Sequence, residues 1–398
     1  MVVVGKKIRI QKFFGYFFIK KWQGDIFMKD ARVSKLAKGL VGYSIQAKKG
    51  EKVLIEAYEV DSFLVTELVK EVYAVGAYPF VSVFDTKVQR ALLNGTTKEH
   101  QDLWIKYDAA RMADMDCYIG IRGGKNSFES SDVSSEKMAL HGSNYGEEVH
   151  GKLRVKKTRW VILRYPNESM AQLASMSTEA FEDYYFDVCN LDYSKMDKAM
   201  DALVKLMDKT DKVRIIGKDT DLRFSIKGIP SVKCSGRINI PDGEVFTAPV
   251  KDSVEGYITY NCPSINQGVK FENVRLEFEK GKIVKFSGNH YDRLEKIFNT
   301  DEGARYIGEF AIGVNPFITQ PIGDILFDEK IRGSIHFTPG ASYDEASNGN
   351  KSAVHWDLIL LMTPDCGGGE IWFDDVLVRK DGEFVIKELK GLNPDGLK

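Results

Sequence analysis

The segment KVLIEAYEVDSFLVTELVKEVYAVGAYPFVSVF spans residues 52–84 and contains a strand, a helix and a second strand in succession. Its first six residues, KVLIEA, form a short apolar run typical of a buried strand. Residues 62–75 place apolar side chains at helical spacing, and Gly76 follows where a helix would end. PFVSVF at 79–84 predicts the next strand. This order of elements predicts a βα unit of a parallel sheet.

The same alternation of helix and strand extends to both sides of this segment. Apolar residues recur at helical spacing over 32–43 and over two stretches within 87–115. CYIGIR at 117–122 and TRWVILRY at 158–165 predict two further strands. Short strands separated by helices indicate a largely parallel sheet with helices on both faces. We therefore expect an α/β domain over residues 28–208.

The pattern changes after Lys209, where short alternating strands and turn dipeptides such as Lys280-Gly281 become frequent. A single helix is expected, over residues 292–304. This half therefore predicts a mostly antiparallel α+β domain over residues 209–398. The expected strands are 213–217, 222–228, 253–261, 274–279, 283–288, 331–338, 354–362 and 370–379.

Length and composition exclude several classes of protein. With 398 residues the chain exceeds one ordinary domain. Lys and Arg total 56 against 57 for Asp and Glu, so we expect no nucleic-acid partner. No apolar run approaches the roughly 20 residues of a membrane helix, so we expect no membrane association. The five cysteines are odd in number and include no C-x-x-C pair, which favours a reducing, cytoplasmic location.

Residues 1–27 differ from the rest because basic and aromatic side chains interleave there. A secretory signal would need an uninterrupted apolar stretch and a small-residue cleavage site, which this stretch lacks. Gly15 and the irregular spacing predict no clean amphipathic helix for a membrane surface. We interpret residues 1–27 as an extension, either a disordered tail or the product of a start codon upstream of Met28, and place no functional residue in it.

Two features of the first domain resemble ligand sites but have simpler interpretations. Gly123-Gly124 follows a strand, but neither a G-x-G-x-x-G nor a P-loop pattern occurs, which favours a tight loop. His141 and His150 lie in a polar stretch beside Glu147 and Glu148, at a spacing that matches no standard zinc helix. We expect these histidines on a solvated helical face.

The second domain places charged and imidazole groups within apolar strands. In AVHWDLIL, alternation puts His355 and Asp357 on the same side of a strand, as metal ligands or as a structural hydrogen-bonded pair. Glu309 in YIGEFAIG and His336 in GSIHF stand among apolar residues, where an ionised group needs a partner. Four such groups within one span favour a cation site. Glu244 follows a Pro-Asp-Gly turn and is either a fifth ligand or an exposed turn residue.

Four motifs around these residues occur in a characteristic order: PDGEVFTAP at 241–249, IGEFAIGVNP at 307–316, GSIHFTPGASY at 333–343 and NGNKSAVHWDL at 348–358. With them, the chain resembles the thermophilic metallo-aminopeptidase family, the aminopeptidase T and aminopeptidase II group. The resemblance covers essentially residues 28–398. It implies a homodimer and a pair of divalent metal ions, with cobalt or zinc favoured over magnesium. The implied metal ligands are Glu244, Glu309, His336, His355 and Asp357, with Tyr343 beside them at the reaction centre.

The function implied by the resemblance is hydrolysis of the N-terminal bond of peptides with a free N-terminus, by a water activated between two metals. We slightly favour Glu309 over Glu244 as the general base and expect Tyr343 to stabilise the developing oxyanion. The main alternative is a ring-cleaving dioxygenase of the same fold, with one iron bound by two histidines and an aspartate. The presence of both glutamates favours hydrolysis. A structural metal site with inert ligands is a third interpretation.

Overall fold

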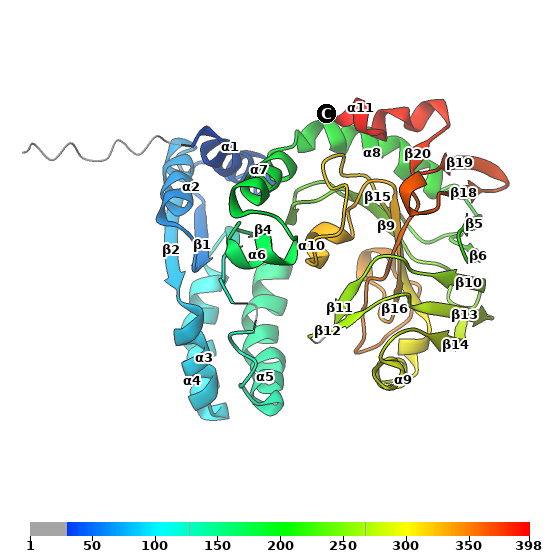
Figure 1. The fold of residues 1–398 in the computed structure, drawn as a ribbon. Coiled ribbons are helices and arrows are strands. Elements are labelled where there is room, and N and C mark those ends of the chain that lie inside the picture. Colours follow the sequence, from blue (N-terminus) through cyan, green and yellow to red (C-terminus); the bar gives the residue numbers. More distant parts are fainter. Residues whose placement is uncertain (1–29, 127, 267) are drawn as a thin grey trace, which may run out of the picture.

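The computed structural model describes residues 30–126, 128–266 and 268–398. The extension expected over residues 1–27 lies outside the described residues. Two lobes lie side by side: the N-terminal lobe contains a parallel sheet and the C-terminal lobe contains antiparallel sheets (Figure 1). The predicted fold class, an α/β part followed by a mostly antiparallel α+β part, is confirmed.

The N-terminal sheet has five parallel strands in the order β2-β1-β3-β4-β8. All four strands predicted for this domain are present, and each is built from the apolar run that predicted it. The fifth strand, β8, comes from the second half of the chain. The strands are β1 (Lys52–Tyr58), β2 (Tyr78–Phe84), β3 (Cys117–Arg122), β4 (Arg159–Arg164) and β8 (Asn239–Ile240).

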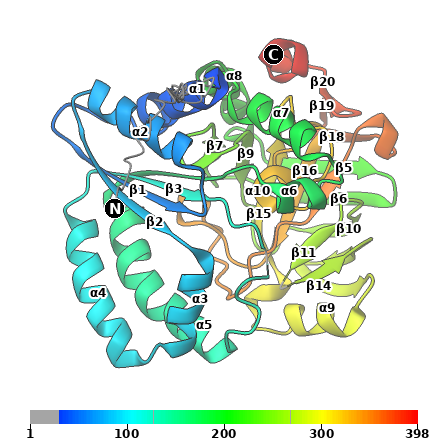
Figure 2. The same cartoon turned by 60° about the vertical axis from the view of Figure 1, so that its left-hand side comes forward.

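Helices cover both faces of this sheet, as the sequence predicts (Figure 2). Val53 and Ile55 of β1 lie in the main core with α1, α2 and α7, whereas Leu54 packs on the other face with Tyr118, α4 and the π-helical segment η2. The helices are α1 (Ala31–Gly39), α2 (Ser62–Ala74), α3 (Thr86–Gly95), α4 (Lys98–Ala113), α5 (Ser135–His141), η2 (Gly142–Val155), α6 (Glu168–Leu173), α7 (Thr178–Cys189) and α8 (Tyr193–Met207).

The C-terminal lobe contains an eight-stranded and a five-stranded antiparallel sheet, together with the short pair β11 (Ser264–Asn266) and β12 (Val269–Phe271). The large sheet comprises β14 (Lys282–Ser287), β13 (Arg275–Glu279), β10 (Glu255–Thr259), β6 (Thr220–Ser225), β5 (Lys212–Gly217), β18 (Gly369–Phe373), β19 (Val376–Lys380) and β20 (Glu383–Phe384). The small sheet comprises β17 (Ile359–Leu361), β16 (Ser334–Pro339), β15 (Ile307–Gly313), β9 (Glu244–Thr247) and β7 (Val232–Cys234).

Aromatic side chains connect the two antiparallel sheets. Phe224 of the large sheet lies 5.0 Å, ring centre to ring centre, from both Phe310 and Phe337 of the small sheet. All three rings belong to the apolar core that also includes the inner face of the parallel sheet. The small sheet is therefore fixed from behind by close packing. This packing holds the polar side chains of β9, β15 and β16 in defined positions.

Three predicted elements differ from the observed ones. Residues 354–362 form a strand only at β17, and His355 is paired with Gly340 by an isolated bridge. Residues 370–379 form two strands joined by a turn at Asp374 (φ 45°) and Asp375 (φ 68°). This turn contains no glycine, so the sequence pattern did not predict it. The helix expected over 292–304 is shorter. Among the described residues, the α-helices of this lobe are α9 (Tyr291–Phe298), α10 (Ile325–Asp328) and α11 (Pro394–Leu397).

The expected solvated position of the two helical histidines is wrong. His150 is half-buried, with its ring edge-on to Tyr118 and Tyr145. His141 is also half-buried and stacks on Tyr145, whose hydroxyl donates a hydrogen bond of 2.7 Å to Asp108. The polar residues between the two histidines in the sequence therefore cover a cluster of aromatic side chains beneath η2.

The domain boundary at residue 209 stays a prediction. β5 begins close to it, but β8 returns to the parallel sheet, and one apolar core includes residues of both halves. Among the described residues, none of the helices has the length and apolar character needed to cross a bilayer.

Candidate metal centre

Neighbouring strands of the small sheet bring the predicted ligands together. Glu244 opens β9 opposite Gly313 of β15, and His336 in β16 is paired with Ala311. The register of β15 shifts between Ile307 and Glu309, which marks a β-bulge. Bulges re-aim side chains at functional sites. Glu309 accordingly lies between the contributions of β9 and β16.

Glu309 is the centre of the cluster. Its Oε1 lies 3.2 Å from Nε2 of His336, and its Oε2 lies 3.4 Å from Nε2 of His355. Nε2 of His355 is also 3.3 Å from Oδ1 of Asp357, which accepts a hydrogen bond of 2.8 Å from the hydroxyl of Thr338. Among the described residues, three groups of three side chains could each hold a metal ion. Two of them share Glu309: one comprises Glu244, Glu309 and His336, and the other comprises Glu309, His355 and Asp357. The third group comprises Cys234, Asp242 and Glu244.

The two histidine rings are oriented by backbone carbonyls. Nδ1 of His355 lies 2.9 Å from the carbonyl oxygen of Ala341, to which it can donate. Nδ1 of His336 lies 3.3 Å from the carbonyl oxygen of Glu329. A carbonyl partner at Nδ1 leaves Nε2 free as a ligand atom, the arrangement found at most metal-binding histidines.

Burial and mutual charge determine how these groups titrate. Burial lowers the pKa of His355, but hydrogen bonds with Asp357 and Glu309 outweigh it and raise the pKa to about 11. Burial likewise lowers the pKa of His336, and Glu244 and Glu309 reverse the shift. Burial raises the pKa of Glu244. Three carboxylates at this depth therefore demand positive charge from their surroundings.

The alternative of an exposed turn residue is wrong for Glu244, which is 6% exposed. The preceding Gly243 has φ 138° and packs against Asn315, whose side-chain amide donates 2.8 Å to the carbonyl oxygen of Asp242. Asp242 accepts hydrogen bonds from the backbone N–H groups of Gly236 and Gly243. The Pro-Asp-Gly turn is thus fixed inside the lobe, and it directs Glu244 into the cluster.

Tyr343 lies at the edge of the same cluster. Its ring centre is 4.7 Å from that of His355 and 5.7 Å from that of Phe246, and the residue is 48% exposed. Burial of the hydroxyl, together with the negative charges of Glu309 and Asp357, raises the pKa of Tyr343. The hydroxyl therefore keeps its proton and can donate a hydrogen bond into the site.

The structure adds one residue that sequence analysis missed. The side chain of Lys330 is fully buried, and its ammonium lies 3.6 Å from Oε1 of Glu244 and forms an ion pair with Glu329. In the sequence it follows Asp328 and Glu329, a polar run that resembles a surface turn. No local pattern distinguishes such a lysine from a solvated one, because its burial arises from the packing of β9 and α10.

The donor set fits divalent metal ions. Two carboxylates, two imidazoles and a third, shared carboxylate suit a borderline cation such as zinc or cobalt. Oε2 of Glu244 is buried, has no hydrogen-bond partner among the described residues, and lies 3.7 Å from Nδ1 of His336. A buried carboxylate oxygen without a donor is costly unless a cation compensates it.

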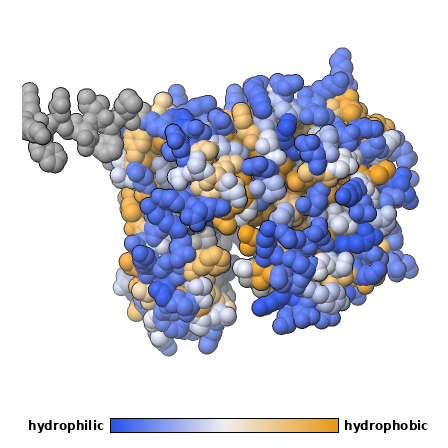
Figure 3. Space-filling view, in the orientation of Figure 1, coloured by the Kyte–Doolittle hydropathy of each residue, from blue (hydrophilic) through white to orange (hydrophobic). Residues whose placement is uncertain are grey.

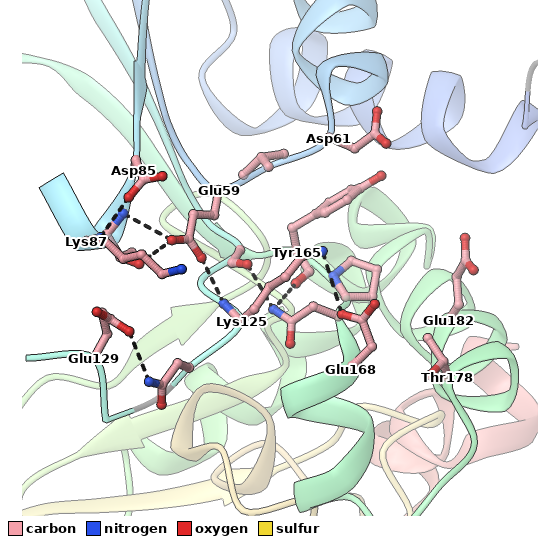
Figure 4. A pocket seen from close by; sticks show the side chains of 16 residues that line it. Glu59, Asp61, Asp85, Lys87, Lys125, Glu129, Tyr165, Glu168, Thr178 and Glu182 are labelled. Atoms are coloured by element: carbon pink, nitrogen blue, oxygen red, sulfur yellow. Dashed lines mark hydrogen bonds and ion pairs between the residues drawn. The ribbon is translucent and has the colours of Figure 1, made fainter.

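A separate pocket of about 890 Å³ lies in the N-terminal lobe, where the loops after β1 to β4 meet (Figure 4). Glu59 accepts hydrogen bonds there from Thr86 and from the backbone of Lys125. Asp61 and Asp85 cap the N-termini of α2 and α3. These carboxylates already have structural partners, and the described residues that line this pocket include no histidine or cysteine.

Most of the chain has recognisable relatives. It matches the thermophilic metalloprotease (M29) family over residues 29–384. Among curated proteins, aminopeptidase PepS of Streptococcus thermophilus is 24% identical over 387 residues, which covers 82% of this chain and 91% of that protein.

Two solved structures have a similar fold. AmpT from Thermus thermophilus aligns with a TM-score of 0.75 and 21% identity, covering 89% of this chain and 99% of that one. A 2,5-dihydroxypyridine dioxygenase from Pseudomonas putida aligns with a TM-score of 0.57 and 14% identity, over 90% of this chain and 99% of that one. At these identities the likeness concerns the fold alone.

Proposed function

The chain belongs to the thermophilic metalloprotease (M29) family, and on this premise we propose that it is a metal-dependent aminopeptidase acting on peptides with a free N-terminus. The observation that carries the proposal is the arrangement of donors, in which Glu309 is shared by two groups of ligand atoms. We propose that each group binds one divalent ion, cobalt or zinc rather than magnesium. Glu244 and His336 would complete one position, and His355 and Asp357 the other.

The bound ions would supply a water of lowered pKa and would polarise the scissile carbonyl. The side chains of the chain do the rest. Glu309 is the carboxylate nearest to both histidines, and we propose that it accepts the proton of the attacking water and passes it to the leaving amine. Tyr343 keeps its hydroxyl proton and would donate a hydrogen bond to the developing oxyanion. The carboxylates also favour the ammonium of a free N-terminus, which an internal peptide bond lacks.

The first experiment is a metal titration of the purified, chelator-treated protein. Cobalt or zinc is added back while the release of p-nitroaniline from leucine p-nitroanilide is followed and the metal per subunit is counted. We expect activity to return as about two ions bind per subunit. Metal binding without amide hydrolysis would exclude the aminopeptidase function.

A glutamine at position 309 tests the shared carboxylate. Glu309→Gln should abolish turnover, because an amide neither accepts the proton nor supplies the negative charge that would help to hold the ions. Turnover and bound metal are measured together, so that loss of the ions is distinguished from loss of the proton acceptor. Glu272→Gln, at the exposed Glu272, is the matched control. A Glu309→Gln enzyme of near wild-type activity would remove Glu309 from the mechanism.

The alternative function is that of a ring-cleaving dioxygenase with one iron. The dioxygenase of similar fold favours it only at the level of architecture. One tightly bound iron per subunit, without release of p-nitroaniline, would support it. The two glutamates beside His336, Glu244 and Glu309, argue against this alternative. A single iron needs only two histidines and an aspartate.

Two further properties belong to the proposal. The five cysteines are unpaired in the structure, which supports a reducing compartment such as the cytoplasm. We also propose a homodimer, for which the exposed edge of the parallel sheet provides a surface.

A further inference from the structure

Lys330 is held at the metal centre by its backbone as well as by its side chain. It follows α10, its N–H donates to the carbonyl oxygen of Phe327 at 3.0 Å, and its carbonyl oxygen accepts from the N–H of Asn315 at 3.1 Å. The residue is 0% exposed. Burying an ammonium is costly unless it is paired, so the position of this charge is fixed by the carboxylates around it.

The two carboxylate oxygens of Glu244 have different surroundings, because only Oε1 lies beside the ammonium of Lys330. Oε1 lies 3.6 Å from Nζ of Lys330, on the side of Glu329. Oε2 has no hydrogen-bond partner within the part of the chain that the structure describes, and it lies 3.7 Å from Nδ1 of His336. Lys330 therefore lies beside Oε1 of Glu244, and Oε2 is the oxygen left available to a metal ion.

The other ligand group has no such cation. Within the described ranges, no lysine or arginine forms an ion pair with Glu309 or Asp357. The imidazoles of His336 and His355 lie beside Glu309, and that of His355 lies beside Asp357. The fixed positive charge is thus placed at one end of the cluster. Like charges repel most strongly in a buried site, where solvent screening is weak.

We propose that Lys330 makes the two metal positions unequal: the position of Glu309, His355 and Asp357 binds the first cation tightly, and that of Glu244, Glu309 and His336 binds the second more weakly. Lys330 is a positioning residue, because its buried ammonium lies beside the carboxylate of Glu244 and acts through that carboxylate. The inference rests on the proposed metal site and is independent of the substrate.

The test is calorimetric titration of the metal-free protein with zinc, with ion content counted in parallel. The wild type should show two binding events that differ at least about tenfold in affinity. Lys330→Met removes the charge while keeping a long side chain, and it should tighten the weaker event about tenfold or more. Lys330→Arg keeps the charge and should keep the difference. Lys233→Met is the control, since Lys233 pairs with Asp197 and Asp201 away from the cluster.

Ligand variants decide the order of binding even if a lysine variant fails to fold. His355→Ala should remove the tight event, and His336→Ala should remove the weak one. Two events of equal affinity in the wild type, the reverse assignment of the histidines, or an unchanged weak event in folded Lys330→Met would each overturn the inference. A wild type that binds no zinc would instead refute the proposed metal site itself.

Discussion

Tyr343 is the residue whose chemistry is most clearly separable from metal binding. It lies beside His355 but is not among the clustered ligand atoms. Tyr343→Phe should lower kcat by about 10²–10³, because one donor to the oxyanion is lost, and should leave the ion content unchanged. Steady-state kinetics with a parallel metal assay would measure this. Phenylalanine preserves the ring contact, so an unchanged kcat would remove the hydroxyl from the mechanism.

His150 gives a prediction for the pH dependence of stability. Burial lowers its pKa to about 4, from about 6.5 in an unfolded chain, and its Nδ1 has no hydrogen-bond partner. As the pH falls from 6.5 to 4, this histidine is protonated in the unfolded chain but stays neutral in the folded protein. Acid therefore favours unfolding in this window.

His150→Phe should abolish this contribution, which reaches up to about 3 kcal/mol near pH 4. Denaturant unfolding of both proteins at pH 7, 5.5 and 4.5 measures the difference. The variant should gain stability relative to the wild type as the pH falls. His100→Phe, at an exposed histidine, is the control. A difference that does not change with pH would contradict the assignment to His150.

The sequence predicted the side chains that cluster in the C-terminal lobe but not the residues that support them. His355 and Asp357 could be paired from their i, i+2 spacing, although this stretch is not a regular strand at His355. Glu309 and His336 were detectable as polar groups in apolar runs. Lys330 was not, because its burial depends on two segments that are 86 positions apart in the chain, as the numbers of Glu244 and Lys330 show. Long-range packing leaves no local signal.

At the scale of elements, the strands with continuous apolar runs and the Lys280-Gly281 turn were predictable, whereas one hairpin turn was not. CYIGIR and TRWVILRY became β3 and β4 because both faces of a parallel strand are buried. The hairpin between β18 and β19 was missed because its turn uses Asp374 and Asp375 in place of the usual glycine. Similarly, η2 was mistaken for a solvated helix because its polar residues mask the aromatic cluster below.

The bulge in β15 gives a prediction for the element that carries the central ligand. A Cβ at Gly308 would overlap the carbonyl oxygens of Ala341 and Gly340. Gly308→Ala should therefore force β15 away from the segment after β16, displacing Glu309 and costing about 1–3 kcal/mol. Thermal unfolding and zinc titration should both report a loss. Gly95→Ala is the control, because a Cβ there meets no atom within 4 Å. An unchanged zinc affinity would show that the site does not depend on the bulge.

At the scale of the whole molecule, the parallel sheet ends in an unprotected strand. Among the described residues β2 is the outermost strand, and it exposes Tyr78, Phe80, Val81 and Val83 with no charged residue in YPFVSVF. Apolar atoms gather at the margin of the N-terminal lobe in the space-filling view (Figure 3). An uncharged apolar edge is normally covered, because its free backbone groups can pair with another strand.

The edge strand β14 of the large antiparallel sheet is, by contrast, protected against pairing with another chain. β14 ends the large antiparallel sheet and exposes Val284, but Lys282 and Lys285 flank it. Lysines on an edge strand oppose pairing with a second chain. The contrast between the two edges selects β2 for self-association, in which two copies related by a two-fold axis would place their β2 strands side by side.

Val83→Lys tests this assignment, because Val83 is 67% exposed and its replacement leaves the core intact. We expect the wild type to be a dimer by light scattering coupled to size-exclusion chromatography, and the variant to be a folded monomer, because a lysine on an edge strand opposes pairing with a second chain. Val284→Lys, on the edge that already carries lysines, should remain dimeric. A dimeric Val83→Lys would move the interface to another surface, and a monomeric wild type would exclude the homodimer. Because the ligands all come from the other lobe, the monomer should still bind zinc, which separates assembly from the metal site.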